Sequence, residues 1–535
     1  MKINNPILTG FNPDPSMLYV EPYYYIATST FEYYPGVQIH RSLDLVNWEV
    51  VARPVCKTNI DMTGITPSCG VWAPCLSYCD GVFYLVYSNV TLWTNAPFKD
   101  VENYIIYTTD VTKEWSETKY INSSGFDASL FHDSDGKSYF VNMEWDFRNP
   151  EGDAFSGIIL QEIDRKTLDL KGEPKTIFYG TERKLVEGPH IYKRGEYYYL
   201  LTAEGGTVWQ HAATLARSKN IWGEYELHPN THLVTSDGHD CKLKKAGHAS
   251  LCVDKHGDWY MAHLVGRPFY KERCTLGRET AIQNIEWIND WPYIASDSAD
   301  TSVKTRQAPR DYFEIKQDAI FKPKSSKILF DKDSLKLKWQ SVRGDISHKY
   351  TASKDGSSLA LQGGASYMNM HEQSMLAYRQ VDIDFEASTK MNFTPTHFQH
   401  MAGLVYRYNE HNQYLLMLSH DKNKTYLTVH SVIDNITNMA ILDQVDTNDV
   451  YLKIIVKASF GQFYYSLDDK SYKAIGDKID ISTLCDEAAS PQFGISTPQL
   501  GFTGAFVGVY CGDLQFKKKV ATFSEFRYVS DTHSI

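Results

Sequence analysis

Hydrophobic and polar residues alternate in short segments along most of the chain, and the three-to-four-residue spacing of an amphipathic helix does not recur in them. The segments are rich in Tyr, Phe, Val and Ile, and Gly, Asp or Asn residues follow most of them. Because these three residues favour tight turns, the pattern predicts antiparallel hairpins, for example where residues 81–88 and 195–202 pair with the segments before them. We therefore expect an all-β protein.

One pattern occurs five times in the first part of the chain. Each copy has a turn, a small or polar residue, a gap with Gly or Asp, and then an aromatic-rich segment, as in NPDPSMLYVEPYYYIATS and GFDASLFHDSDGKSYFVNM. The copies align at Ser16, Cys75, Ser129, His190 and Ser250, which lie 54 to 61 residues apart. A repeat of about 60 residues made of short strands is typical of a β-propeller blade. The sequence therefore predicts five blades, with most aromatic side chains packed between them.

The second part of the chain has a different composition. Only Trp339 of the eleven Trp residues lies there, and strand-like segments continue without a repeat. A polar stretch without clear periodicity separates the two parts. We predict a five-bladed β-propeller over residues 1–300, a linker over 301–327, and a β-sandwich of jelly-roll type over 328–535.

The charge and cysteine content narrow the functional classes. The 535 residues include 65 acidic and 54 basic side chains, a net charge of −11, without a Lys- or Arg-rich run. This balance argues against nucleic acid or an anionic membrane as a partner. Nine irregularly spaced cysteines, together with an N-terminus (MKINNPILTGFNP) unlike a signal peptide, predict reduced thiols and a cytoplasmic location. Cys75 and Cys79 lie close together, but we expect no zinc site there, because the sequence has no second pair of ligands at zinc spacing.

Three carboxylates and a histidine stand at or next to equivalent positions of the repeat: Asp14, Asp127, Glu187 and His248. The first strand of each blade lines the propeller axis, so these side chains are predicted to face one another at one end of it. Each alone could be a turn residue or an edge charge. Their shared position indicates a functional site, because burying unpaired carboxylates is costly. Paired carboxyl groups in an aromatic-walled pocket suit hydrolysis of a glycosidic bond, and a third carboxylate can raise the pKa of the acid.

Nine motifs resemble glycoside hydrolase family 43, and within it the two-domain β-xylosidases: NPDPS, ATSTFEYYPGVQIHRSLDLVNW, GVWAP, GFDASLFHD, VEGPH, YYLLTAEGGT, GHASL, LGRETAIQ and GFTGAFVG. The resemblance covers essentially the whole chain. It implies a propeller that carries the site, a second domain that closes it, and single-displacement hydrolysis with inversion. It also implies that Asp14 is the general base, that Glu187 is the general acid, and that Asp127 tunes the pKa of the acid and helps to position it.

The resemblance implies sugar contacts for six further residues: Arg278, Phe31, Trp72, Trp145, Thr207 and Phe506. Phe506 is the residue with which the second domain would seal the pocket, so that cleavage occurs from a chain end. From the residues alone, Arg278 beside Glu279 is equally consistent with a surface ion pair. For Phe31, Trp72 and Trp145, the residues alone favour packing between blades over contact with a sugar. These alternatives stay open at this point.

His248 matches a histidine that in some family members lies next to a metal ion, usually calcium. A histidine on such a strand is more often a hydrogen-bonded core residue, and calcium prefers oxygen ligands, so both interpretations are kept. No other cofactor is expected. Cys75 departs from the family pattern, in which an acidic residue commonly follows WAP, so a polar contact from this turn is in doubt.

The leading hypothesis is an exo-acting 1,4-β-xylosidase that releases xylose from the non-reducing ends of xylo-oligosaccharides, with α-L-arabinofuranosidase side activity. One alternative is an α-L-arabinofuranosidase or arabinan-degrading enzyme on the same scaffold. The other is a carbohydrate-binding propeller without catalysis. The expected partners are xylo-oligosaccharides or other pentosides and further copies of the chain in a homo-oligomer, whose subunit number the sequence leaves open.

Overall fold

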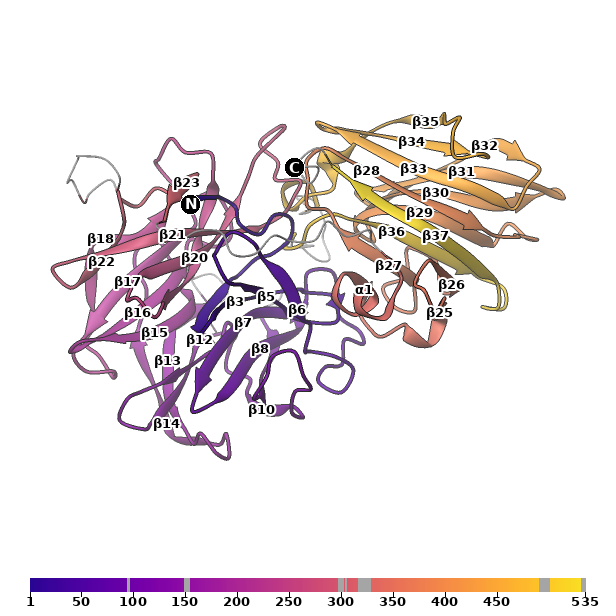
Figure 1. Ribbon diagram of the computed structural model, residues 1–535. Coiled ribbons are helices and arrows are strands. Elements are labelled where there is room, and N and C mark those ends of the chain that lie inside the picture. Colours follow the sequence, from indigo (N-terminus) through magenta and orange to yellow (C-terminus); the bar gives the residue numbers. More distant parts are fainter. Residues whose placement is uncertain are drawn as a thin grey trace.

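The structure is a computed structural model that describes residues 1–93, 97–148, 154–296, 303, 306–315, 329–489 and 501–530. Strands form almost all of its regular elements, in two bodies that lie next to each other (Figure 1). The two α-helices of the described residues are α1 (Lys332–Leu337) and α2 (Asp486–Ala489). Neither has the length or the apolar character needed to cross a membrane.

Five four-stranded antiparallel sheets form the first body. Sheet 1 contains β2 (Ser16–Val20), β3 (Tyr23–Thr28), β5 (Gln38–Ser42) and β6 (Glu49–Ala52). Sheet 2 contains β7 (Gly70–Cys79), β8 (Val82–Trp93), β9 (Lys99–Thr108) and β10 (Lys119–Asn122). Sheet 3 contains β11 (Ser129–His132), β12 (Ser138–Trp145), β13 (Phe155–Ile163) and β14 (Leu170–Phe178). Sheet 4 contains β15 (Glu187–Arg194), β16 (Tyr197–Glu204), β17 (Ala212–Ser218) and β18 (Glu226–Thr235). Sheet 5 contains β19 (Lys244–Val253), β20 (Trp259–Gly266), β21 (Glu279–Ile288) and β22 (Trp291–Ile294).

The serine of the repeat joins neighbouring sheets through their first strands. Ser16 Oγ in sheet 1 accepts a hydrogen bond from Leu76 N in sheet 2 (2.9 Å). Ser250 Oγ in sheet 5 accepts one from Met17 N in sheet 1 (2.8 Å). These bonds close the ring between its last and first members, so the five sheets are the predicted blades of a propeller.

Aromatic rings fill the space between the blades, as predicted. Tyr25 of blade 1 contacts Phe83 of blade 2 edge to face, with ring centroids 5.5 Å apart. On the other side of blade 1, Tyr24 contacts Tyr260 of blade 5 at 6.0 Å. Edge-to-face pairs of this kind add to the hydrophobic stabilisation that comes from burying the rings.

The second body is a sandwich of two antiparallel sheets, one of eight strands and one of seven. The larger contains, in spatial order, β32 (Ile436–Val445), β31 (Lys424–Ile433), β30 (Asn412–Asp421), β29 (His400–Asn409), β36 (Phe506–Asp513), β27 (Ser374–Arg379), β24 (Trp339–Val342) and β4 (Tyr33–Tyr34). The smaller contains β25 (Tyr350–Ala352), β26 (Ser358–Gln362), β37 (Val520–Val529), β28 (Phe385–Asn392), β33 (Asp449–Lys457), β34 (Phe460–Ser466) and β35 (Lys473–Asp480). Leu404 and Leu452, one from each sheet, are fully buried in the same core. The predicted fold, a five-bladed propeller followed by a β-sandwich, is confirmed.

The propeller and the sandwich share a sheet at their seam. β4 leaves blade 1 and pairs with β24, so that Tyr34 lies opposite Ser341. The neighbouring Tyr33 stacks on Phe506 of the sandwich, with ring centroids 3.7 Å apart. The segment that follows Phe31 of the predicted site is therefore a strand of the second domain's sheet.

A small part of the predicted linker can be placed. Of residues 301–327, only 303 and 306–315 lie within the described residues. In this part, β23 (Tyr312–Glu314) pairs with β1 (Lys2–Asn4) at the start of the chain. The predicted domain bounds stay predictions.

Candidate active site

The backbone has an unusual conformation at the repeat position. Asp14 and Asp127 (both φ 55°), Gly188 (58°) and His248 (43°) all lie in the left-handed region. The ladder between β15 and β16, like that between β19 and β20, shifts register at this place. This conformation is uncommon for residues other than glycine, so its recurrence at equivalent positions of four blades shows that the repeat fixes the backbone at this place. Glu187, at the start of β15, directly precedes Gly188.

Asp14 is buried and held by two hydrogen-bond donors. The Ser29 hydroxyl donates to Oδ2 (2.7 Å), and Arg278 Nη1 donates to Oδ1 (3.0 Å). Burial alone would raise the pKa of Asp14, but the charge of Arg278, the imidazole of His248 and the bond from Ser29 lower it below its ordinary value. Asp14 is therefore an ionised carboxylate, as a general base must be. Arg278 is only 2% exposed, so the alternative of a surface ion pair is wrong.

The pKa of Asp127 is shifted in the opposite direction from that of Asp14. Burial raises its pKa well above the ordinary value, and the negative charges of Glu187 and Asp14 raise it further. His248 Nδ1 lies 3.8 Å from Asp14 Oδ1 and 3.9 Å from Asp127 Oδ2, between the two carboxyl groups. The structure thus brings the three predicted carboxylates and His248 together. Because the charge of Glu187 opposes the ionisation of the buried Asp127, the two carboxyl groups together retain a proton at a pH at which Asp14 is ionised.

Aromatic rings form one wall of this site. Phe31 and Trp72 are in contact, with ring centroids 5.7 Å apart, and the Arg278 guanidinium lies 5.1 Å from the Phe31 centroid. Trp93 lies 4.9 Å from Trp72 and 5.4 Å from Trp145. Phe31 and Trp72 therefore lie next to the arginine that holds Asp14, whereas Trp145 reaches them through an intervening ring.

The second domain reaches the site through Phe502, which was not among the predicted site residues. Arg278 Nη2 donates to Phe502 O (2.8 Å), and the Phe502 ring lies 5.8 Å from that of Phe31. Phe506 is fully buried and stacks on Tyr33. This corrects the choice of Phe506: the motif GFTGAFVG does contact the site, but through its first phenylalanine, and the second packs behind the wall.

Two family models match the chain: glycosyl hydrolases family 43 over residues 3–292, and the beta xylosidase C-terminal concanavalin A-like domain over residues 327–529. The chain belongs to glycosyl hydrolase family 43. It is 41% identical to a beta-xylosidase of Bacillus subtilis strain 168 over 99% of both chains. It is 42% identical to xylosidase/arabinosidase 43B of Humicola insolens over 98% of this chain and 97% of that protein. The crystal structure of xylan beta-1,4-xylosidase from Bacillus halodurans C-125 matches 99% of this chain and 100% of its own, with a TM-score of 0.91 and 40% identity.

The site of this family 43 glycosidase includes a histidine that no sequence motif marked. His211 is fully buried, and its Nδ1 donates to Lys245 O (3.0 Å). Burial lowers the pKa of His211 to about 3, so the ring is neutral and Nε2 keeps a lone pair. Nε2 has no hydrogen-bond partner among the described residues. Because His211 lies near enough to Asp14 to lower its pKa, this nitrogen is a candidate acceptor for a sugar hydroxyl.

His248 behaves as a buried, neutral member of the cluster. Burial lowers the pKa of its imidazole, and the ring packs against Gly188, where a Cβ atom would lie 3.0 Å from it. In the parts of the chain that the structure describes, no group of three or more His, Cys, Asp or Glu side chains could hold a metal ion. A calcium site at His248 is therefore not supported. Glycoside hydrolysis by carboxyl groups and water needs no cofactor.

Two other sequence candidates lie in different surroundings. Thr207 is half-buried in the turn after β16, and its contact with a sugar stays a prediction. Cys75 is buried in a core cluster together with Ala128 and Leu130 of blade 3. Burial raises the pKa of the Cys75 thiol to about 11, so Cys75 is a neutral packing residue.

Ser68 connects three parts of the site wall. Its backbone N–H donates to Glu32 Oε2 (3.0 Å), and its carbonyl accepts from Trp72 Nε1 (2.9 Å). Its hydroxyl accepts from the backbone N–H of Phe502 (3.1 Å). One residue therefore fixes an aromatic ring of the propeller and the contact residue of the second domain relative to each other.

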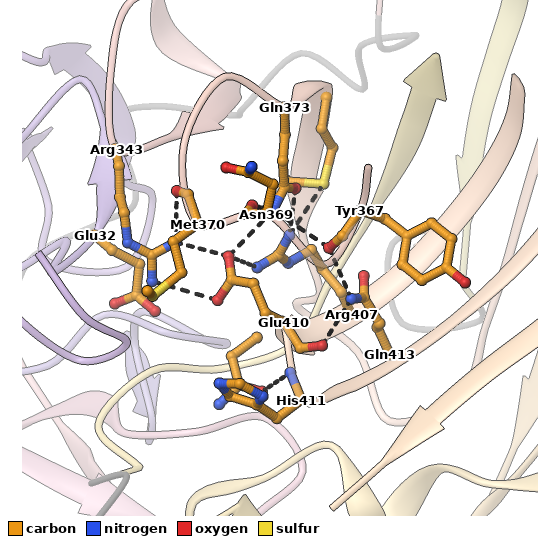
Figure 2. A network of polar contacts seen from close by, with 12 residues as sticks. Glu32, Arg343, Tyr367, Asn369, Met370, Gln373, Arg407, Glu410, His411 and Gln413 are labelled. Atoms are coloured by element: carbon orange, nitrogen blue, oxygen red, sulfur yellow. Dashed lines mark hydrogen bonds and ion pairs between the residues drawn. The ribbon is translucent and has the colours of Figure 1, made fainter. Parts of the chain in front are cut away.

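Glu32 continues this connection into the sandwich (Figure 2). Its carbonyl accepts from the backbone N–H of Arg343 (2.8 Å). Figure 2 shows Glu410 between two arginines: Arg343 Nη1 lies 2.6 Å and Arg407 Nη2 2.9 Å from Glu410 Oε1. All three side chains of this ion-pair group are completely buried. The seam behind the site thus contains a second charged cluster.

Proposed function

We propose that this glycosidase is an exo-acting β-xylosidase that releases xylose from the non-reducing ends of xylo-oligosaccharides with inversion. The observation that carries the proposal is the electrostatic split between Asp14, which Arg278 keeps ionised, and the proton-retaining pair of Asp127 and Glu187. Single displacement needs a base and an acid in different protonation states at the same pH. The similarity to the beta-xylosidase of B. subtilis supports the choice of sugar.

In the proposed reaction, Asp14 accepts a proton from a water molecule while the water oxygen attacks the anomeric carbon. Glu187 donates its proton to the glycosidic oxygen as the C–O bond breaks, and the product has the α configuration. Asp127 raises the pKa of Glu187 by like-charge repulsion, so that the acid stays protonated near neutral pH. Phe502, which contacts Arg278 and Phe31, adds a residue of the second domain to the wall of the site.

Substrates with different leaving groups distinguish the proposed role of Glu187 from that of Asp14. In Glu187→Gln, hydrolysis of xylobiose should fall by about 10²–10⁴-fold, because its poor leaving oxygen must be protonated. An aryl β-xyloside with an acidic phenol needs no such proton and should lose much less. Asp14→Asn should lose activity on both substrates. The exposed Glu182→Gln is the matched control, and both rates should stay at the wild-type value.

Two results would contradict these roles. Equal losses on both substrates in Glu187→Gln would remove its assignment as the acid. β-Xylose as the first product seen by NMR would show retention, which is incompatible with water activation by Asp14.

A second candidate, α-L-arabinofuranosidase, is favoured by the similarity to xylosidase/arabinosidase 43B of H. insolens. The ratio of kcat/KM on an aryl β-xyloside and an aryl α-L-arabinofuranoside, measured on one preparation, decides between the two. Sugar binding without turnover of either substrate would instead favour the non-catalytic alternative. The homo-oligomer and the cytoplasmic location stay predictions, to be tested by sedimentation and by cell fractionation.

A further inference from the structure

The structure buries five arginines among the described residues: Arg53, Arg278, Arg343, Arg379 and Arg407. Three of these five form ion pairs with a carboxylate, either Asp14 or Glu410. Arg53 and Arg379 form none with any residue that the structure describes, although they are only 6% and 5% exposed. A buried charge without a counter-charge is costly, so these two residues require an explanation.

Both arginines donate to neutral acceptors alone. Arg53 Nη2 donates to Gln38 Oε1 (2.7 Å) and Nη1 to Trp339 O (2.8 Å). Arg379 Nη1 donates to Asn12 Oδ1 (2.9 Å). Gln38 Nε2 also donates to Asn12 Oδ1 (3.0 Å), so the two guanidinium groups are linked through two amide side chains. These amides orient the arginines but leave both positive charges uncompensated.

Two buried N–H donors at this place have no hydrogen-bond acceptor among the described residues. Arg379 Nε is buried and has no hydrogen-bond partner among the described residues, and the same holds for Gln340 Nε2. Gln340 Oε1 accepts from Arg379 Nη2 (2.9 Å), so these two unpartnered donors belong to neighbouring side chains. Arg379 lines the cavity described next, so an acceptor atom of a ligand there could satisfy its Nε.

Arg53 and Arg379 line a cavity of about 860 Å³ at the seam of the two domains. β6, which directly precedes Arg53, lies beside α1 of the second domain, and Arg379 is the last residue of β27 (Figure 1). The other basic residues that line the cavity are His40 and Lys338. The cavity has room for a small organic molecule.

The charged side chains around the cavity do not neutralise Arg53 and Arg379. Burial lowers the pKa of Arg379 to about 9, and burial together with the charge of Arg379 lowers the pKa of Arg53. Two carboxylates line the same cavity. Glu49 is paired with Arg41, and Asp333 is exposed at the start of α1 without an ion pair to either arginine. The interior of the cavity is therefore electropositive, in a protein whose net charge is −11.

We propose that this seam cavity binds a small oxyanion, a phosphate or a carboxylate, between Arg53 and Arg379. Planar guanidinium groups bind oxyanions with paired, charge-assisted hydrogen bonds, and the free Arg379 Nε supplies one further donor. The site is separate from the carboxylate cluster of the active site, whose excess charge is negative. It does not depend on which sugar the enzyme hydrolyses.

Calorimetric titration of the full chain tests the proposal. Inorganic phosphate and glucuronate, a sugar carboxylate, are titrated separately against sodium chloride at the same ionic strength. We expect saturable binding of at least one of the two, with a Kd on the order of 1 mM or tighter. The better ligand shows whether the source of the oxyanion is a phosphate or an acidic sugar. The proposal is overturned if neither binds, or if chloride binds equally well.

Two variants locate the site. Arg379→Gln and Arg53→Gln should each weaken binding by about tenfold or more, because each removes one of the two charges. Arg165→Gln, at a partly exposed arginine of blade 3 that is paired with Asp80 and does not line the cavity, should bind like the wild type. Circular dichroism checks that each variant is folded, and a crystal of the wild type grown with the bound anion gives its position without any substitution. Unchanged affinity in both variants, or an anion found elsewhere, would overturn the assignment.

Discussion

Two buried charged clusters lie on either side of the same aromatic wall, and they differ in charge balance. The seam cluster joins Glu32 and Glu410 to Arg343 and Arg407, so acids and bases are equal in number (Figure 2). The active site joins three carboxylates to a single arginine. The first arrangement pairs Glu410 with two arginines, whereas the second leaves an excess of negative charge in a buried place.

The difference separates structural from catalytic use of buried charge. In the seam, two arginines hold the pKa of Glu410 far below its usual range despite burial. In the active site, burial and the negative charges of the neighbouring carboxylates both raise the pKa of Asp127. A cluster that is electrostatically unsatisfied costs folding free energy, but it is the one that can move protons.

The largest effect should come from removing one charge of the site. In the proposed mechanism, Asp127→Asn removes the repulsion that keeps Glu187 protonated, so kcat/KM on xylobiose should fall by about 100-fold or more. The basic limb of the pH–rate profile should move to lower pH, because the pKa of the acid falls. The melting temperature should stay the same or rise, since a like-charge contact is lost. Rate profiles and thermal unfolding of the same preparation measure both effects.

Asp135→Asn is the matched control for this prediction, because Asp135 lies exposed in the turn after β11. It should change neither the rate nor the profile. A basic limb that stays in place in Asp127→Asn would contradict the electrostatic role, even if the rate falls.

The second largest effect should be a loss of unfolding free energy without a comparable loss of kcat/KM. Glu410→Gln leaves Arg343 and Arg407 buried and unpaired, which should cost about 3–5 kcal/mol of unfolding free energy. The folded variant should keep far more of its kcat/KM than Asp127→Asn, because Glu410 forms its ion pairs with Arg343 and Arg407 in the seam. Urea unfolding and steady-state rates provide the comparison. Glu386→Gln, which removes a partly exposed partner of Lys453, is the control and should cost less than about 1 kcal/mol.

A smaller effect should distinguish the two phenylalanines of the GFTGAFVG motif. Phe502 is half-buried at the site, so Phe502→Ala should raise KM for xylobiose by about tenfold with little change in stability. Phe506 is fully buried, so Phe506→Ala should lower the unfolding free energy by about 3–5 kcal/mol and leave KM nearly unchanged in the folded fraction. The reverse pattern would show that Phe506 forms the wall after all.

Repetition explains how much of this could be predicted. The spacing of Ser16, Cys75, Ser129, His190 and Ser250 predicted the blades, since equivalent residues make equivalent bonds around the axis. The same alignment brought Asp14, Asp127 and His248 to one place, because position in a propeller follows from register.

The parts of the site that could not be predicted depend on contacts that do not recur from blade to blade. Phe502 and Glu32 meet through Ser68, and these three residues are far apart in the chain. His211 is held by a backbone carbonyl and follows no motif. Such pairings arise from the docking of one domain on another, which no local pattern encodes.

The smallest effect concerns the pH dependence of stability, and its sign differs between the two clusters. Burial raises the pKa of Glu32 to about 7, so its contribution to stability is complete below its ordinary pKa of 4.5 and is lost as the pH rises to about 7. Asp14 has a lowered pKa, so its contribution is complete above its ordinary pKa of 3.8 and is lost at lower pH.

Glu32→Gln keeps a neutral side chain at every pH and should therefore flatten the decline of unfolding free energy between about pH 5 and pH 8. Part of the slope should remain, because burial also raises the pKa of Asp486 to about 7. Urea unfolding at several pH values measures the slope. A variant that declines as steeply as the wild type would show that Glu32 is already ionised in the folded protein over this pH range, which would contradict the raised pKa of Glu32.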